Sequence, residues 1–102
     1  MKIQTEINGD ILTLHLSGVL DLAHSSEVRD VFKQALQDHQ NAKQLIVDMK
    51  DVRTLDSSGL ASLVELMKNT RNAGIELRLT ELNPSVKAVF ELSRLDQIFT
   101  IG

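Results

Sequence analysis

The sequence predicts an α/β fold: a mixed β-sheet, with a leading antiparallel hairpin and then parallel strands, and helices packed on it. The hairpin is predicted because apolar and polar residues alternate on both sides of Asn8-Gly9-Asp10, a turn signal that joins antiparallel strands. Parallel strands are predicted because apolar runs then alternate with segments of helical periodicity, as in strands joined by crossover helices. A chain of 102 residues has room for one modest core, so we expect residues 1–102 to form a single domain.

The first part of the chain supplies two strands and a helix. Residues 3–7 and residues 12–16 alternate with a period of two, as half-buried strands do, and Gly18 ends the second run. Residues 18–22 either extend the sheet briefly or form a loop. A helix capped at one of residues 24–26 follows, and it carries a single apolar stripe of Val28, Val31, Phe32, Ala35 and Leu36.

A third strand and a second helix come next. Residues 45–49 are almost continuously apolar, which is typical of a strand covered on both faces. We expect residues 50–54 to be a connection. The helix after it is predicted over residues 57–71, and Asn72-Ala73-Gly74 ends it because glycine suits a left-handed cap.

The last part of the chain repeats the strand-then-helix order. Residues 75–79 alternate and predict a strand. Asn83 and Pro84 predict a helix start, with Asn as N-cap and Pro at the first helical position. Residues 95–101 are a short apolar ending for which both a helical and an extended conformation remain open.

The segment Leu55-Asp56-Ser57-Ser58-Gly59-Leu60 lies where the third strand gives way to the second helix. The first N–H groups of a helix have no partner within it, and the helix dipole makes that end partly positive. Such an end attracts anions, including a phosphate carried on serine. Capping alone also explains Asp and Ser at a helix start.

Helical periodicity separates the two serines of this segment. The core face should hold four apolar residues, Leu60, Leu63, Val64 and Met67. On this wheel Ser57 points inward, whereas Ser58 shares the outer face with Ala61 and Ser62. If a second protein modifies one serine, we therefore expect it to be Ser58, with Ser57 as second choice.

Composition and motifs exclude several classes. The chain has no cysteine and a net charge of −3 with scattered basic residues, so disulfides, Cys-based zinc sites and direct nucleic-acid binding are not expected. No apolar run is long enough for membrane insertion, and the polar N-terminus lacks a signal peptide, so a cytoplasmic protein is expected.

Catalysis is not supported by any complete set of residues. No nucleophile elbow or phosphate-binding glycine loop occurs, and the three histidines are expected at the surface. Four acids, Asp21, Asp48, Asp51 and Asp56, could gather around a divalent cation. Capping and turn roles are favoured for them, so we expect no enzymatic activity, no metal and no cofactor.

Two motifs in this order of elements resemble the STAS domain, and more narrowly the bacterial anti-sigma factor antagonists. The first is the Leu55–Leu60 segment, and the second is Gly18-Val19-Leu20-Asp21, which is similar to the family's Gly-x-Leu-Asp. The region from Asn83 to Leu95 is similar to the family's final helix. The resemblance covers essentially all of residues 1–102.

The resemblance implies a partner-switching protein. The unmodified antagonist would bind an anti-sigma factor that is also a serine kinase of the histidine-kinase-like ATPase type. That kinase would phosphorylate Ser58 and so be released, and a serine phosphatase would reverse the step. The implied partner-binding residues are Asp21, Asp56, Ser57, Ser58, Gly59, Ala61 and Ser62.

Two other readings of the sequence stay open. One is a STAS subunit of a transporter ATPase complex or of a larger signalling assembly, without a kinase cycle. The other is a small enzyme that uses the clustered acids.

Overall fold

The computed structural model describes residues 1–102, and its elements follow the predicted order. They are β1 Lys2–Asn8, β2 Ile11–Leu20, α1 Leu22–Asp38, β3 Gln44–Leu55, α2 Ser57–Asn72, β4 Glu76–Thr80, α3 Pro84–Leu92, the short 3-10 helix η1 Leu95–Gln97 and β5 Thr100–Ile101. The ending that the sequence left open is thus helical first and extended afterwards.

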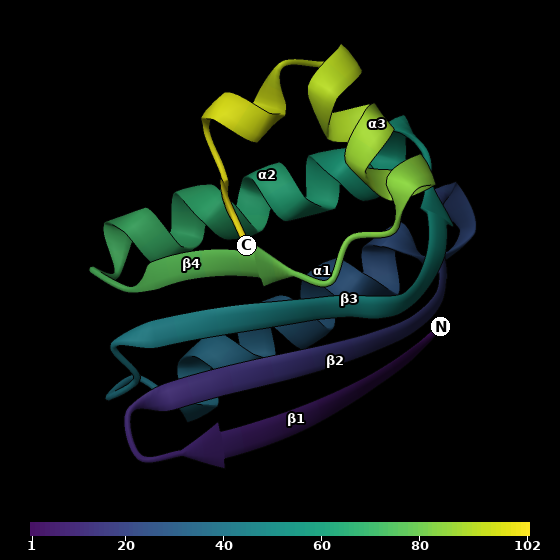
Figure 1. Cartoon of the computed structure of the whole chain (residues 1–102). Coiled ribbons are helices and arrows are strands. Elements are labelled where there is room, and N and C mark those ends of the chain that lie inside the picture. Colours follow the sequence, from purple (N-terminus) through teal and green to yellow (C-terminus); the bar gives the residue numbers. More distant parts are fainter.

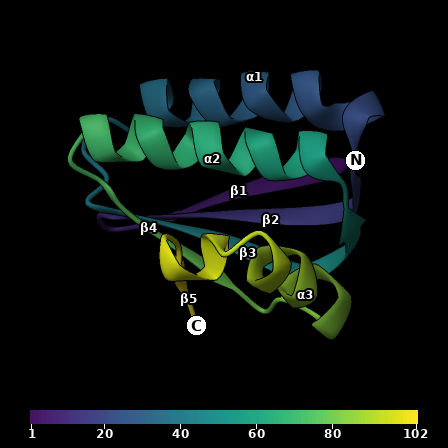
Figure 2. The same ribbon diagram turned by 90° about the horizontal axis from the view of Figure 1, so that it is seen from above.

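The strands form one sheet in the order β1-β2-β3-β4-β5 (Figure 1). β1 and β2 are antiparallel, and every later neighbour is parallel, which confirms the predicted mixed sheet. α1 and α2 lie side by side on one face of the sheet, while α3 and η1 lie near the end of β3 and near β5 (Figure 2).

β2 and α1 differ from the prediction at their junction. β2 continues to Leu20, so residues 18–20 extend the sheet. α1 begins at Leu22, with Asp21 as its N-cap residue, three to five residues before the predicted cap. The reason is a long-range contact: the backbone N–H of Leu22 donates to the Asp56 carboxylate, 34 residues away, which no local pattern reveals.

β3 is also longer than predicted, because the expected connection over residues 50–54 is part of the strand. Its pairing with β2 shifts register twice, between His15 and Ser17 and between Gly18 and Val19, and each time β3 contributes one extra residue. Bulges of this kind change which side chains face the core. The buried residues of this part are accordingly three apart, namely Met49, Val52 and Leu55. The period-two pattern on which strand prediction depends is therefore lost here.

The core fills the space between the sheet and the α1–α2 layer. Leu12, Leu14 and Leu16 of β2 and Leu45 and Val47 of β3 are essentially inaccessible to solvent. α3 joins the same core from the other end through Val86 and Phe90. The Phe90 ring meets Phe99 edge to face, with centroids 5.4 Å apart and ring planes at 88°.

The buried stripe of α2 is rotated from the predicted one. Leu63 and Met67 are buried as expected, but Leu60 and Val64 are only half-buried, and Ser62, Leu66 and Thr70 take the remaining inner positions. α2 packs against α1 as well as the sheet, and Glu65 pairs with Arg29 and Lys33 of α1. Because α2 packs against α1 on one side and against the sheet on the adjacent side, its buried stripe is displaced by about one residue from the predicted one. The periodicity of a single helix does not reveal the second packing partner.

Candidate functional site

One carboxylate joins the first turns of α1 and α2. Asp56 is the N-cap residue of α2, and its Oδ1 accepts from the Gly59 N–H at 2.9 Å. Its Oδ2 accepts from the Leu22 N–H at 3.1 Å, at the first position of α1. Two partly positive helix ends therefore meet at Asp56. The bond from Gly59, supplemented by the one from Leu22, holds the pKa of Asp56 below its ordinary value because both favour the charged carboxylate.

A second acid lies at the start of α1. Asp21 occupies the N-cap position but makes no side-chain capping bond; its Oδ1 lies 2.7 Å from Nδ1 of His24 instead. Both side chains are about one-third exposed. The sequence predicts His24 at the surface and assigns no role to it. Its position three residues after an acid at a helix start is nevertheless a local signal for this pair. Asp21, His24 and Asp56 thus surround adjoining helix starts.

The two serines of the first turn of α2 are oriented differently from the prediction. Ser57 is exposed, so its predicted inward orientation is wrong, and Ser58 is half-buried rather than fully outward. Ser62, which was expected on the outer face, is fully buried and donates its hydroxyl to the Gly59 carbonyl at 2.6 Å. The cause is the rotation of α2 described above. Both Ser57 and Ser58 remain in contact with solvent, whereas Ser62 does not.

Gly59 is the point where α2 presses on the end of β2. A Cβ placed on Gly59 would lie 2.0 Å from the Leu20 carbonyl oxygen and 2.8 Å from Leu20 Cγ. The Asp56 N–H donates to the same Leu20 carbonyl at 3.2 Å, which ties the strand end to the helix start. Only glycine permits this approach. Gly59 and Ser62 therefore support the first turn from beneath.

An apolar groove begins at Ser57 and follows the outer side of α2. Its volume is about 490 Å³. We call it the α2 groove, and it is lined by Ser57, Leu60, Ala61, Val64, Glu65, Lys68 and Leu95. Leu22, the first residue of α1, is 72% exposed. Apolar surface of this kind beside polar groups is typical of sites that bind another protein.

The acids that the sequence grouped do not form a metal site. No three His, Asp or Glu side chains lie close enough together to share a metal ion. Asp21 and Asp56 adjoin through Leu22, but Asp48 points to the sheet face away from α1, where it lies 2.7 Å from His15 Nδ1. None of the helices combines the length and the apolarity that a bilayer crossing requires.

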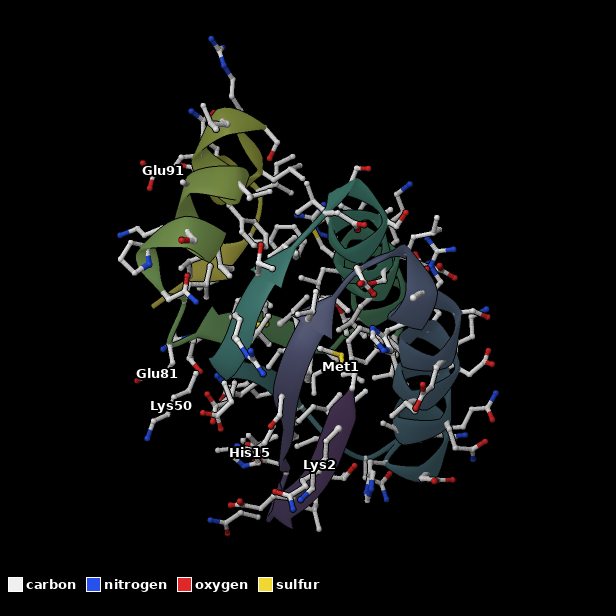
Figure 3. All side chains as sticks on the ribbon, turned by 90° about the vertical axis from the view of Figure 1, so that its right-hand side faces the viewer. Met1, Lys2, His15, Lys50, Glu81 and Glu91 are labelled. Carbon is white, nitrogen blue, oxygen red and sulfur yellow. The ribbon has the colours of Figure 1, made fainter.

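His15 connects three strands on that open face. Its Nε2 lies 3.1 Å from Glu6 of β1, opposite its contact with Asp48 of β3. Figure 3 shows His15 and Lys50 on the side of the sheet away from α1. The hydrogen bond with Asp48, then that with Glu6, raises the pKa of His15. Burial would raise the pKa of Asp48, but hydrogen bonds from the Lys50 N–H and from His15 outweigh it and lower that pKa.

Comparison with known proteins finds the same family and the same fold. The STAS domain family matches residues 2–102. The anti-sigma F factor antagonist of Paenibacillus polymyxa is 30% identical over 101 residues, which covers 99% of this chain and 86% of that protein. A crystal structure of an anti-sigma factor antagonist from Mycobacterium paratuberculosis superposes with a TM-score of 0.86 at 18% identity, covering 98% of this chain and 83% of that one. The structure of the Bacillus cell fate determinant SpoIIAA in its phosphorylated form gives 0.73 at 20% identity, covering 99% and 91%.

Proposed function

The chain belongs to the STAS domain family, and on that premise we propose that it is an anti-sigma factor antagonist that works by phosphorylation-controlled partner switching. In this proposal it is a cytoplasmic binding protein and not an enzyme. Its partner is an anti-sigma factor that is also a serine kinase of the histidine-kinase-like ATPase type. A serine phosphatase restores the unmodified state.

The observation that carries the proposal is the position of Ser58. It lies in the first turn of α2, in partial contact with solvent, two residues after Asp56, whose carboxylate accepts hydrogen bonds from the first turns of both helices. Ser57 is the second choice, and its greater exposure gives it a physical argument of its own. The similarity to SpoIIAA, solved in a phosphorylated form, supports a phosphoserine switch on this fold.

A phosphate on Ser58 should leave the fold intact. Phosphoserine carries about −1.5 to −2 charges at neutral pH, and a helix N-terminus accommodates negative charge. The same charge would stand beside Asp56 and near Asp21, at the centre of the proposed interface. Desolvating these like charges under a docked partner costs free energy, so the partner is released by weakened binding and little refolding is needed.

The partner surface in this proposal consists of exposed and half-exposed groups around that serine. They are Asp21, Asp56, Ser57, Ser58 and Ala61. The α2 groove continues this surface with apolar side chains and offers a place for an apolar anchor of the partner. Gly59 and Ser62 act from beneath by fixing the geometry of the turn.

Calorimetry with the kinase partner tests the proposal. Ser58→Ala should bind like the unmodified protein, and Ser58→Asp should bind at least about tenfold more weakly, which corresponds to roughly 1.4 kcal/mol. Ser57→Asp adds the same charge one residue away on the same proposed surface, so a smaller loss of affinity than that of Ser58→Asp would assign the switch to position 58. Equal affinities for Ser58→Ala and Ser58→Asp would remove the electrostatic mechanism.

Pull-down followed by intact mass, with and without ATP, distinguishes the alternative assembly role. A kinase partner predicts an ATP-dependent mass increase of one phosphate, which phosphopeptide mapping assigns to Ser58. Recovery of a transporter subunit, with Ser58 unmodified, would instead favour a STAS subunit of a transporter complex. Phosphate found on Ser57 would move the switch to the neighbouring hydroxyl.

A further inference from the structure

β1 is a long, regular and uncovered edge of the sheet. It pairs only with β2, and Figure 1 shows no element beyond it. Its seven residues pair with β2 without any register shift, and they include no proline. Bulges, prolines and shortness protect many natural edge strands, and β1 has none of these three; Lys2 and Glu6 are its only charged residues. The opposite edge, β5, has only two residues.

The hairpin register shows which backbone groups of β1 are free. Asn8 and Ile11 flank the two-residue turn, where Gly9 has φ +63°, so they form the hydrogen-bonded pair that closes it. Bonding alternates along an antiparallel ladder, so every second residue of β1 directs its N–H and C=O away from β2. These residues are Ile3, Thr5 and Ile7. No other backbone hydrogen bond in the molecule uses their N–H or C=O groups.

The side chains of β1 are complementary to those of a second, antiparallel β1. Ile3 and Ile7 lie on the face that also carries the helices, and Ile7 is 48% exposed because α1 packs over β2. Lys2 and Glu6 lie on the opposite face. Ile3 and Ile7 lie symmetrically about the central residue Thr5, so a β1 strand paired with its own reverse brings isoleucine against isoleucine.

We propose that two copies of this chain associate through antiparallel pairing of their β1 strands, about a two-fold axis at Thr5. In the fully overlapped register Ile3 faces Ile7 of the second copy, and Thr5 faces its own equivalent; these are the hydrogen-bonded pairs. Lys2 then lies diagonally across from Glu6 of the second copy, within reach of its long side chain. Two five-stranded sheets become one sheet of ten strands. The buried area of one strand pair is small, so the dimer forms at high protein concentration.

The molar mass as a function of concentration tests the pairing in the intact chain. Sedimentation equilibrium should show the mass rise from 11.4 kDa towards twice that value as the concentration increases. Thr5→Pro removes only an outward N–H, which an edge strand tolerates, so it should remain monomeric while folding normally. Thr5→Val keeps the N–H and should follow the wild type. Circular dichroism on each variant establishes that the comparison is between folded proteins.

Disulfide trapping tests the register, since the natural chain contains no cysteine. Facing residues of a hydrogen-bonded antiparallel pair have Cα atoms about 5.5 Å apart, within the range that a disulfide spans. Thr5→Cys should therefore give a covalent dimer under mild oxidation. Lys2→Cys is the control, because its two equivalents lie at opposite ends of the paired strands and should not join. A wild type that stays at 11.4 kDa at millimolar concentration, a dimer that survives Thr5→Pro, or equal trapping of both cysteine variants would overturn the proposal.

Discussion

Gly59→Ala tests the close approach of α2 to the end of β2. The new Cβ would lie 2.0 Å from the Leu20 carbonyl oxygen, whereas ordinary contact begins at 3.4 Å. The clash is with backbone, so no side-chain rotation relieves it, and α2 must move away from β2 by more than about 1 Å. Overpacking usually costs about 1–3 kcal/mol, and the backbone contact places this variant at or above the upper end.

Helix propensity opposes this cost, because alanine is favoured over glycine within a helix by about 1 kcal/mol. We expect a net loss of at least about 2 kcal/mol in the free energy of unfolding, and thus a melting temperature lower by at least roughly 8–16 °C. A domain of this size has about 5–15 kcal/mol in total, so the variant should still fold at room temperature.

Urea unfolding followed by far-UV circular dichroism measures this loss, since the chain has no Trp or Tyr for fluorescence. Gly74→Ala is the control: its φ is +72°, and a Cβ there meets nothing within 4 Å. That variant should lose only the cost of a left-handed alanine, about 1–2 kcal/mol. A Gly59→Ala protein as stable as the wild type would refute the close approach of α2 to β2.

Three further predictions concern the Asp56 cap, the His15 cluster and the α3 core. The pKa of Asp56 is lowered by folding, so its contribution to stability is complete above the unfolded pKa of about 3.9 and is lost as pH falls through the folded value. The stability difference between wild type and Asp56→Asn should therefore shrink in acid; a difference unchanged by pH would contradict the cap. The pKa of His15 is raised, so its contribution is complete below about 6.5 and is lost as pH rises through the folded value. Urea titrations should show the advantage of wild type over His15→Gln decline as the pH rises above about 6.5, and a rising advantage would contradict the raised pKa. Phe90→Ala should cost about 3–5 kcal/mol, because Phe90 is fully buried against Phe99, and a loss below about 1 kcal/mol would mean that α3 is not part of the core.

Local signals predicted the elements well, and long-range contacts account for the differences. The hairpin, the strand–helix order, the Asn83 cap and the apolar stripe of α1 were all visible because each depends on residues close in sequence. The start of α1 was not, because its first N–H is bonded to Asp56 of a different helix. β3 was cut short because two bulges replace period two by period three over Met49, Val52 and Leu55.

The candidate site follows the same division. Its location at the start of α2 was predictable from Asp56 and the following serines. The orientation of those serines was not predictable, since it depends on how α2 packs against both α1 and the sheet. The apolar surface from Ser57 to Leu95 likewise emerges only in three dimensions, whereas the pairing of Asp21 with His24 had a local signal in its spacing of three residues.

The affinity of the kinase partner for stoichiometrically phosphorylated protein, set against its affinity for the unmodified protein, tests the proposed switch most directly. The fold should be unchanged by circular dichroism, and mapping should place the phosphate on Ser58. We predict that calorimetry then shows binding weakened at least about tenfold by the modification. Undiminished binding of the phosphorylated protein would contradict the switch, whatever the fold resembles.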